Sequence, residues 1–157
     1  MGSWKTRKPW RQKIEETPPA RVVPIPTRWH KRYGPGTMVI PHPKDLEALI
    51  RKIPKGKLVT QSQLRAQLAQ QYKVDIACPL TTGIFLRMVA EAAEEDQEQG
   101  KKEITPYWRV VKDDGSLHPK YPGGVEQHER YLRNEGHEIL PGKGKKPPKV
   151  RLTEDIR

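Results

Sequence analysis

Few side chains in this sequence could act as nucleophiles or metal ligands. Cys78 is the only cysteine, so a disulfide framework and a cysteine-rich zinc site are both excluded. The five histidines show neither an HExxH pattern nor paired metal-ligand spacing, and we expect no metal and no cofactor. Cys78 lies just before a predicted helix, where a small, buried, apolar role is the simplest interpretation.

The excess of basic over acidic residues lies in the two ends of the chain. The net charge is +11, and residues 1–32 carry nine Lys and Arg against two Glu. Residues 142–157 carry six Lys and Arg against two acidic residues, whereas residues 33–141 carry fifteen of each. Basic segments bind phosphate without reading sequence, because binding releases condensed counterions. A purely solubilising role for the two ends is the alternative.

The N-terminal region is rich in proline. Eight of the 16 prolines lie in residues 1–43, and proline interrupts helices, so 1–40 is predicted to be an extended, basic arm. In this arm Arg28, Trp29, Lys31 and Arg32 interleave charge with an aromatic ring, which suits phosphate contacts and stacking on nucleic acid. An equally good interpretation is that Trp29 packs on the domain and only the charges face water. The tail, 141–157, is predicted to be basic and disordered.

Residues 41–140 have the pattern of one folded domain. Its predicted elements are a short helix opened by Pro43 and Asp45, a helix after the capping box Thr60–Gln63, a long helix from Thr81 to about Gln97, a strand at 108–111, a hairpin turn at 113–116 and a helix from Val125 to Asn134. Two helices separated by a short break and followed by a wing predict a mainly α fold with a small β-hairpin. This is a winged helix-turn-helix domain with extended basic arms.

Three motifs of this domain occur in the order and spacing of a known family. They are Ile53–Lys57 (IPKGK), Arg109–Leu117 (RVVKDDGSL) and a stretch from Tyr121 to His137 that contains Tyr-x-Gly-Gly and Glu-Gly-His. On these motifs, residues 53–139 resemble the DNA-binding domain of the O6-alkylguanine-DNA alkyltransferases.

In that family a Pro-Cys-His-Arg-Val strand carries the reactive thiol. This chain has Pro-Tyr-Trp-Arg-Val, so Tyr107 replaces the cysteine and Trp108 replaces the histidine. A phenol, with a pKa of about 10, is a poor nucleophile at neutral pH compared with a thiolate. Glu135 matches the family's glutamate but has no thiol to activate. We therefore expect a protein that is not an enzyme, and alkyl transfer to Cys78 is the least favoured hypothesis.

The same pattern, with the fold kept and the cysteine lost, occurs in alkyltransferase-like proteins. Resemblance to them implies a sensor that binds alkylated guanine flipped out of the duplex, which requires stacking walls and hydrogen bonds to the base edge. The implied lesion pocket is formed by Tyr107, Trp108, Tyr121 and Glu135. Trp108 departs even from this subgroup and could fill the pocket.

The resemblance also implies a DNA-contacting surface that has changed at two positions. Leu80 stands at the position of the family's arginine finger and Gln61 at that of a phosphate-contacting tyrosine, although an apolar wedge can also unstack bases. The acidic run Glu91–Glu103 repels phosphate, and we interpret it as a solvated helix end rather than a protein-docking site. The implied DNA-contacting residues are Thr60, Gln61, Ser62, Leu80, Thr81, Thr82, Arg87, Arg109, Gly123 and Gly124.

Two candidate functions follow. The first is a non-enzymatic DNA-binding protein that senses O6-alkylguanine by base flipping for DNA repair. The second is a general nucleic-acid or protein-interaction module on the same scaffold, with its pocket closed by Trp108. The expected partner is double-stranded DNA, with alkylated DNA and a repair protein as further candidates. No apolar run approaches the roughly 18 residues that span a bilayer, and we expect a cytoplasmic monomer.

Overall fold

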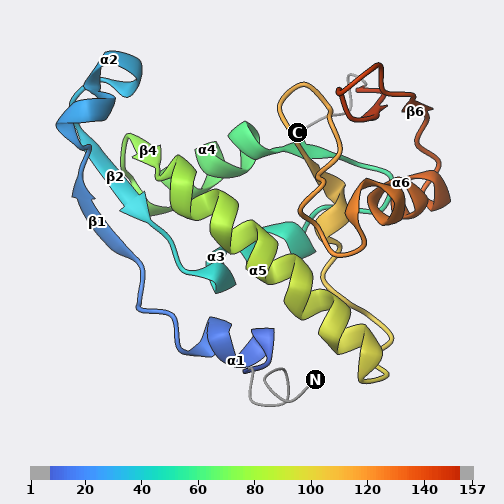
Figure 1. The fold of residues 1–157 in the computed structure, drawn as a ribbon. Coiled ribbons are helices and arrows are strands. Elements are labelled where there is room, and N and C mark those ends of the chain that lie inside the picture. Colours follow the sequence, from blue (N-terminus) through green and yellow to red (C-terminus); the bar gives the residue numbers. More distant parts are fainter. Residues whose placement is uncertain (1–7, 153–157) are drawn as a thin grey trace.

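The computed structural model describes residues 8–152 (Figure 1). Residues 1–7 and 153–157, the outermost parts of the two predicted basic ends, lie outside the described residues. Across residues 8–152, no helix combines the length and the apolar character needed to cross a membrane. The helices are α1 (Trp10–Glu15), α2 (His30–Tyr33), α3 (Pro43–Arg51), α4 (Gln61–Tyr72), α5 (Pro79–Glu98) and α6 (Gly124–Asn134), with 3-10 turns η2 (Thr27–Trp29) and η3 (Tyr107–Arg109). The strands are β1 (Arg21–Pro24), β2 (Thr37–Ile40), β3 (Val59–Thr60), β4 (Ile76–Ala77), β5 (Val110–Val111), β6 (Ile139–Leu140) and β7 (Lys149–Val150).

Helix α5 is the element around which the domain is built. Its buried residues include Leu86, Val89 and Ala93, which recur every three or four positions and so form one apolar face. This face packs against α3, α4 and η3, and α1 contacts the second half of the same helix. In Figure 1, α5 runs diagonally across the middle of the molecule. The two halves of α5 therefore meet different parts of the chain.

The order of helices agrees with the fold predicted from the sequence. Helix α4 begins at the predicted capping box, in which Gln63 N donates to Thr60 Oγ1 (3.2 Å) and Thr60 N donates to Gln63 Oε1 (2.9 Å). A short connection containing β4 then leads to α5, which gives a helix-turn-helix arrangement. The mainly α, winged-helix-like fold is confirmed.

Residues 8–40 differ from the predicted extended arm. Strands β1 and β2 pair antiparallel from Arg21–Ile40 to Pro24–Thr37, and β2 continues in parallel to β4. Trp29 and Tyr33 pack against a small cluster that contains Cys78. The prolines permit this structure because Pro24 ends an edge strand, where no ladder hydrogen bond from its nitrogen is needed. The N-terminal region is therefore part of the fold in the described residues.

The predicted wing and tail are also arranged differently. The turn at 113–116 is present, with Gly115 at φ 89° and Lys112 N donating to Ser116 O (3.2 Å). Its two sides do not form a hairpin ladder, because β5 pairs in parallel with β3 and Ser116 bridges to Lys149. The prediction of a disordered tail is wrong for 141–152, since β7 pairs antiparallel with β6 and buries Val150 in the core.

The acidic run predicted as a solvated helix end packs against the domain at Glu95 and Asp96, whereas Glu98 and Glu103 are exposed as predicted. The Glu95 carboxylate accepts hydrogen bonds from Trp10 N (2.8 Å) and Arg11 N (3.2 Å) at the start of α1. Asp96 is buried and accepts from Arg11 Nη2 (2.9 Å), and the same guanidinium binds both oxygens of Glu47 (2.8 and 2.9 Å). These acidic residues fix α1 against α3 and α5.

Candidate nucleic-acid interface

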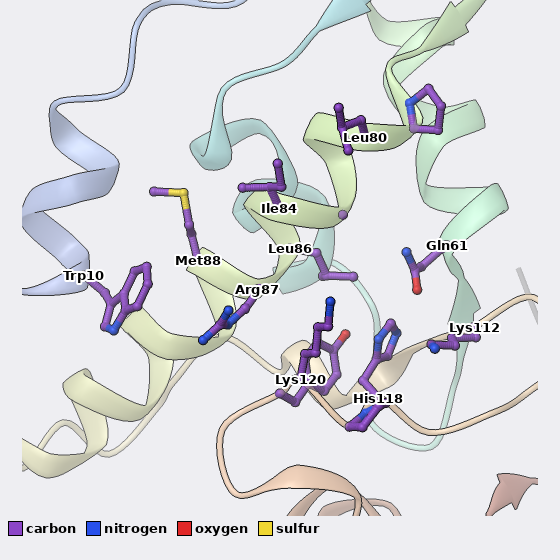
Figure 2. Close-up of a pocket in the computed structure, with 14 residues that line it drawn as sticks. Trp10, Gln61, Leu80, Ile84, Leu86, Arg87, Met88, Lys112, His118 and Lys120 are labelled. Atoms are coloured by element: carbon purple, nitrogen blue, oxygen red, sulfur yellow. The ribbon is translucent and has the colours of Figure 1, made fainter. Parts of the chain in front are cut away.

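A cleft of about 490 Å³ lies between the first half of α5 and the loop 112–121 (Figure 2). Gln61, at the start of α4, and Trp10, at the start of α1, complete its wall. A concave site of this volume is in the range that accommodates small organic ligands. The residues that line it are Trp10, Gln61, Pro79, Leu80, Gly83, Ile84, Leu86, Arg87, Met88, Lys112, His118, Pro119, Lys120 and Tyr121.

Two stacked rings contribute to the loop side of the cleft. The His118 ring lies on the Tyr121 ring, with centroids 4.3 Å apart and planes 27° apart. The Tyr121 hydroxyl donates to the Val110 carbonyl (3.0 Å), which fixes the ring. The backbone N–H of His118 donates to Nδ1 of His128 (3.1 Å). Nδ1 of His128 is therefore an acceptor, and its Nε2–H donates to the Trp108 carbonyl (2.9 Å).

Both histidines are neutral at physiological pH. Burial lowers the pKa of His118 to about 3, and the nearby His128 and Lys112 act in the same direction. Burial lowers the pKa of His128 to about 4, although its hydrogen bond to the Trp108 carbonyl acts in the opposite direction. The loop side of the cleft therefore presents a neutral imidazole rather than a cation.

The α5 side of the cleft carries an exposed apolar ridge. Leu80 is 61% exposed and Ile84, one turn later, is 52% exposed. Cations border this ridge, since Arg87 lies on α5 and Lys112 and Lys120 lie across the cleft (Figure 2). Arg87 Nε is 3.7 Å from Glu91, whereas neither lysine has an acidic partner within ion-pair distance among residues 8–152. Apolar and basic groups thus converge on one opening.

Tyr107 and Trp108, predicted as pocket walls, do not line this cleft. Tyr107 is fully buried, and its hydroxyl donates to Glu94 Oε2 (2.7 Å). Its burial and its bond to Glu94 raise the pKa of the Tyr107 phenol well above its ordinary value. Trp108 stacks flat on Tyr131, with centroids 4.1 Å apart, and so does not plug the cleft. Tyr121 is the predicted pocket residue that does line it.

Glu135 and Arg109 form an internal ion pair instead of a pocket wall and a DNA contact. Arg109 donates from Nη2 to Glu135 Oε2 (2.7 Å) and from Nε to Oε1 (3.0 Å), and its Nη1 donates to the Ile53 carbonyl (2.6 Å). The two side chains are only 14% and 8% exposed. Burial alone would raise the pKa of Glu135, but the hydrogen bonds from Arg109 hold it below its usual value.

Apart from Arg109, the predicted DNA-contacting residues fall into three groups. Gln61, Leu80 and Arg87 line the cleft, and they remain candidates for DNA contact. Thr60 and Thr82 are buried, which contradicts a direct contact with DNA. The last group, Ser62, Thr81, Gly123 and Gly124, lies outside the lining.

Ser62 and the two glycines have evident structural roles. Ser62 N donates to Asp113 Oδ1 (2.9 Å) and its hydroxyl donates to Asp113 Oδ2, so this residue ties α4 to the loop. Gly123 and Gly124 have φ values of 77° and 70° at the start of α6. A side chain at Gly123 would come within 2.6 Å of Gln127 Cβ, so glycine is required there.

The basic residues of the N-terminal region form a surface that we call the tip, defined as Arg28, Lys31 and Arg32 on η2 and α2. All three are exposed. The guanidinium carbon of Arg28 lies over the Trp29 ring, 5.0 Å from its centroid, and that of Arg32 lies over the Tyr33 ring, 5.3 Å from its centroid. Both interpretations of the segment are compatible, because the rings pack inward next to Cys78 while the charges face solvent. The two rings therefore pack against the cluster that contains Cys78, the residue just before α5.

The class of protein is given by the family that the sequence matches. Residues 44–137 match the family described as 6-O-methylguanine DNA methyltransferase, DNA binding domain, and the chain belongs to this family. The similarity predicted from the sequence motifs is confirmed.

The fold is similar to that of S. pombe Atl1, solved in complex with damaged DNA that contains O6-carboxymethylguanine. The TM-score is 0.51 at 17% sequence identity, and the match covers 73% of this chain and 93% of that chain. A search of curated proteins finds no match. At this sequence identity, the match shows that this chain has a fold similar to that of Atl1.

Several lining residues were not predicted from the sequence, notably Trp10, Ile84, Lys112, His118 and Lys120. His118 lies three residues before the matched Tyr121 and Lys120 lies directly before it, so their place in the sequence offered a signal. Ile84 lies four residues after Leu80, which puts the two on one helix face. Trp10 had no comparable signal, because it lies outside the segment with family motifs.

Proposed function

We propose that this protein binds double-stranded DNA without catalysing alkyl transfer and captures an unstacked alkylated guanine in the cleft. The observation that carries the proposal is the cleft itself, in which an exposed apolar ridge faces Lys112 and Lys120 above the ring of Tyr121. Lysine side chains suit the phosphates next to a displaced nucleotide, and an aromatic ring suits a base. The cleft thus offers complementary groups to both parts of a nucleotide.

Leu80 and Ile84 are suited to separate stacked bases. An apolar side chain inserted between base steps lowers the cost of unstacking, because it fills the space that the base vacates. Both residues are exposed in the free protein, so no rearrangement is needed before they meet DNA. In this proposal α5 is the helix that contacts the duplex, and Leu80 takes the place of a charged finger.

The environment of two side chains supports the proposed absence of alkyl transfer. The Tyr107 hydroxyl is buried and engaged by Glu94, and its raised pKa disfavours the phenolate that would attack an alkyl group. Cys78 is buried with Ile25 and Met38 and does not line the cleft. Neither side chain can present a nucleophile to a base in the cleft.

Binding to matched duplexes tests the proposal. We expect a duplex with one O6-methylguanine to bind roughly tenfold more tightly than the same duplex with guanine, because a damaged base is easier to unstack. Fluorescence anisotropy measures both affinities, and 2-aminopurine next to the lesion should brighten as stacking is lost. Intact-mass measurement after incubation should show an unmodified chain. Equal affinities for the two duplexes would contradict base capture. An alkyl mass added to the chain would contradict the proposal that the protein does not catalyse alkyl transfer.

A second candidate function is favoured by the packing of Tyr107 and Trp108. Because both rings are engaged by the core, the cleft has fewer aromatic walls than the sequence predicted. A general duplex-binding or protein-interaction module would need no base-stacking walls. It would bind lesion-containing and plain duplex equally, with 2-aminopurine fluorescence unchanged.

The tip gives the proposed complex a second contact with the duplex. Its three exposed cations can neutralise backbone phosphates of the bound duplex. Replacing Arg28, Lys31 and Arg32 by Gln should reduce the slope of log affinity against log salt by about 2 to 3, since each phosphate contact contributes roughly 0.9. Anisotropy titrations with plain duplex over a range of salt concentrations measure this slope.

The control removes the same charge elsewhere. Lys52, Lys55 and Lys102 are exposed and do not line the cleft, so their replacement by Gln should change the slope less than the tip variant does. Equal slopes for the tip variant and the wild type would show that the tip does not touch DNA. Equal reductions in both variants would show a general effect of net charge.

A further inference from the structure

His118 has a buried hydrogen-bonding atom without a partner. The side chain is 8% exposed, and among the described residues its Nε2 has no hydrogen-bond partner. Leaving such a group unsatisfied is unfavourable, because it has lost its bonds to water and gained none in return. His118 also lines the cleft, on the side opposite α5 (Figure 2). The unpartnered atom therefore belongs to a residue of the proposed binding site.

The surroundings of His118 hold the ring in place without using Nε2. One face stacks on Tyr121, and the backbone N–H is fixed by His128. The lowered pKa keeps the ring neutral, so it carries one N–H donor and one nitrogen acceptor and attracts a polar edge rather than a phosphate. A positioned, neutral imidazole at the side of a cleft is suited to read the edge of a planar heterocycle.

We propose that His118 is a specificity-determining residue that forms a hydrogen bond through Nε2 with the edge of the captured base. This inference rests on the proposed base capture and adds the group that distinguishes one base from another. A site that satisfies a buried polar atom only with the correct ligand rejects ligands that lack the matching group. The preference for an O6-alkylated guanine would then depend on His118, whereas affinity for plain duplex would depend on the cations.

The chain contains a matched control for this atom. Nε2 of His137 is likewise buried and without a partner among residues 8–152, but His137 does not line the cleft. Burial lowers the pKa of His137 as well. The two histidines share an unsatisfied ring nitrogen and differ in whether the residue lines the cleft.

The experiment compares His118→Phe, His118→Gln and His137→Phe with the wild type. Each protein is titrated with a duplex containing O6-methylguanine and with the matched guanine duplex, and its thermal midpoint is measured without DNA. We expect His118→Phe to lose about tenfold in preference for the lesion, with plain-duplex affinity unchanged. Its thermal midpoint at pH 7 should be unchanged or higher, because Phe keeps the stacking on Tyr121 and removes the unsatisfied nitrogen. His118→Gln, which restores a donor and an acceptor, should recover part of the preference, and His137→Phe should keep all of it.

Each remaining outcome overturns the inference in a recognisable way. A wild type with equal affinity for both duplexes removes the proposed base capture, and the role of His118 with it. A wild type that prefers the lesion, together with an equally selective His118→Phe, removes only the role of His118. A lowered thermal midpoint with lost affinity for both duplexes would show that His118 is merely structural. Equal losses in His118→Phe and His137→Phe would show that the effect does not come from the cleft.

Discussion

Acidification from pH 7 to pH 5 is expected to lower the free energy of unfolding by about 4 kcal/mol, because His118 and His128 must stay neutral in the fold. Their pKa values are lowered from 6.5 to about 3 and about 4. Between pH 6.5 and 4 the unfolded chain binds protons at these rings and the folded chain does not, so stability falls as the pH falls. Above pH 6.5 both states are neutral and the contribution is constant. Urea unfolding at the two pH values, at constant ionic strength, measures the difference.

The control for this prediction is His118→Phe, which should show about half of the acid loss because one of the two rings remains. His137→Phe corrects for a third histidine, whose pKa is also lowered by burial. The lowered pKa values of Glu47 and Glu135 act in the same direction but at lower pH, since an unfolded glutamate titrates near about 4.3. Equal free energies at pH 7 and pH 5 would contradict the burial of the two rings.

Arg109→Ala is expected to reduce the free energy of unfolding by about 3 to 5 kcal/mol, because it leaves a buried carboxylate without its partner. Arg109 donates three hydrogen bonds to Glu135 and one to the Ile53 carbonyl. Its loss therefore removes the side-chain hydrogen bonds that join η3 to the end of α6 and to Ile53. Urea unfolding at pH 7 gives the change. A residue that only contacted DNA would leave this free energy unaltered and weaken duplex binding instead.

Replacing both members of the pair provides the matched control. Arg109→Met combined with Glu135→Leu removes the buried charge together with its partner, and should recover much of the stability lost in Arg109→Ala. Duplex affinity of Arg109→Ala, measured where the variant remains folded, should equal that of the wild type. Stability close to wild type in Arg109→Ala would show that the ion pair contributes little to the fold.

The local elements of the domain could be predicted because their signals lie in adjacent residues. The capping box at Thr60 and the glycines at the start of α6 mark helix starts through short-range hydrogen bonds and backbone angles. Strand partners could not be predicted in this way. Nothing near Val110 indicates that it pairs with Val59, and nothing in the basic tail indicates that Val150 completes a strand with Ile139. Such pairings depend on long-range packing.

The sequence indicated the location of a residue where that location depends on its own segment. The prediction failed where a residue's role depends on a distant partner. Leu80, predicted as a DNA contact, and Tyr121, predicted as a pocket residue, both line the cleft. Arg109 and Glu135 were expected to meet DNA or a base, but each satisfies the other. His118 was missed because its interest arises from an absent partner, a property visible only once the surrounding chain is in place.

Arg11 shows that the folded unit includes residues outside the segment of the family match. Its guanidinium bridges Glu47 on α3 and Asp96 on α5, but the residue precedes position 44, where the family match begins. A fragment trimmed to 44–137 would keep both buried carboxylates, with Arg51 beside Glu47 and Lys101 beside Asp96, but it would lose the guanidinium that bridges the two. The segment that the family match covers is therefore shorter than the segment that these ion pairs hold together, and we expect the longer segment to unfold as one unit. Proteases should find the junction between α1 and β1 resistant for as long as the domain core stays closed.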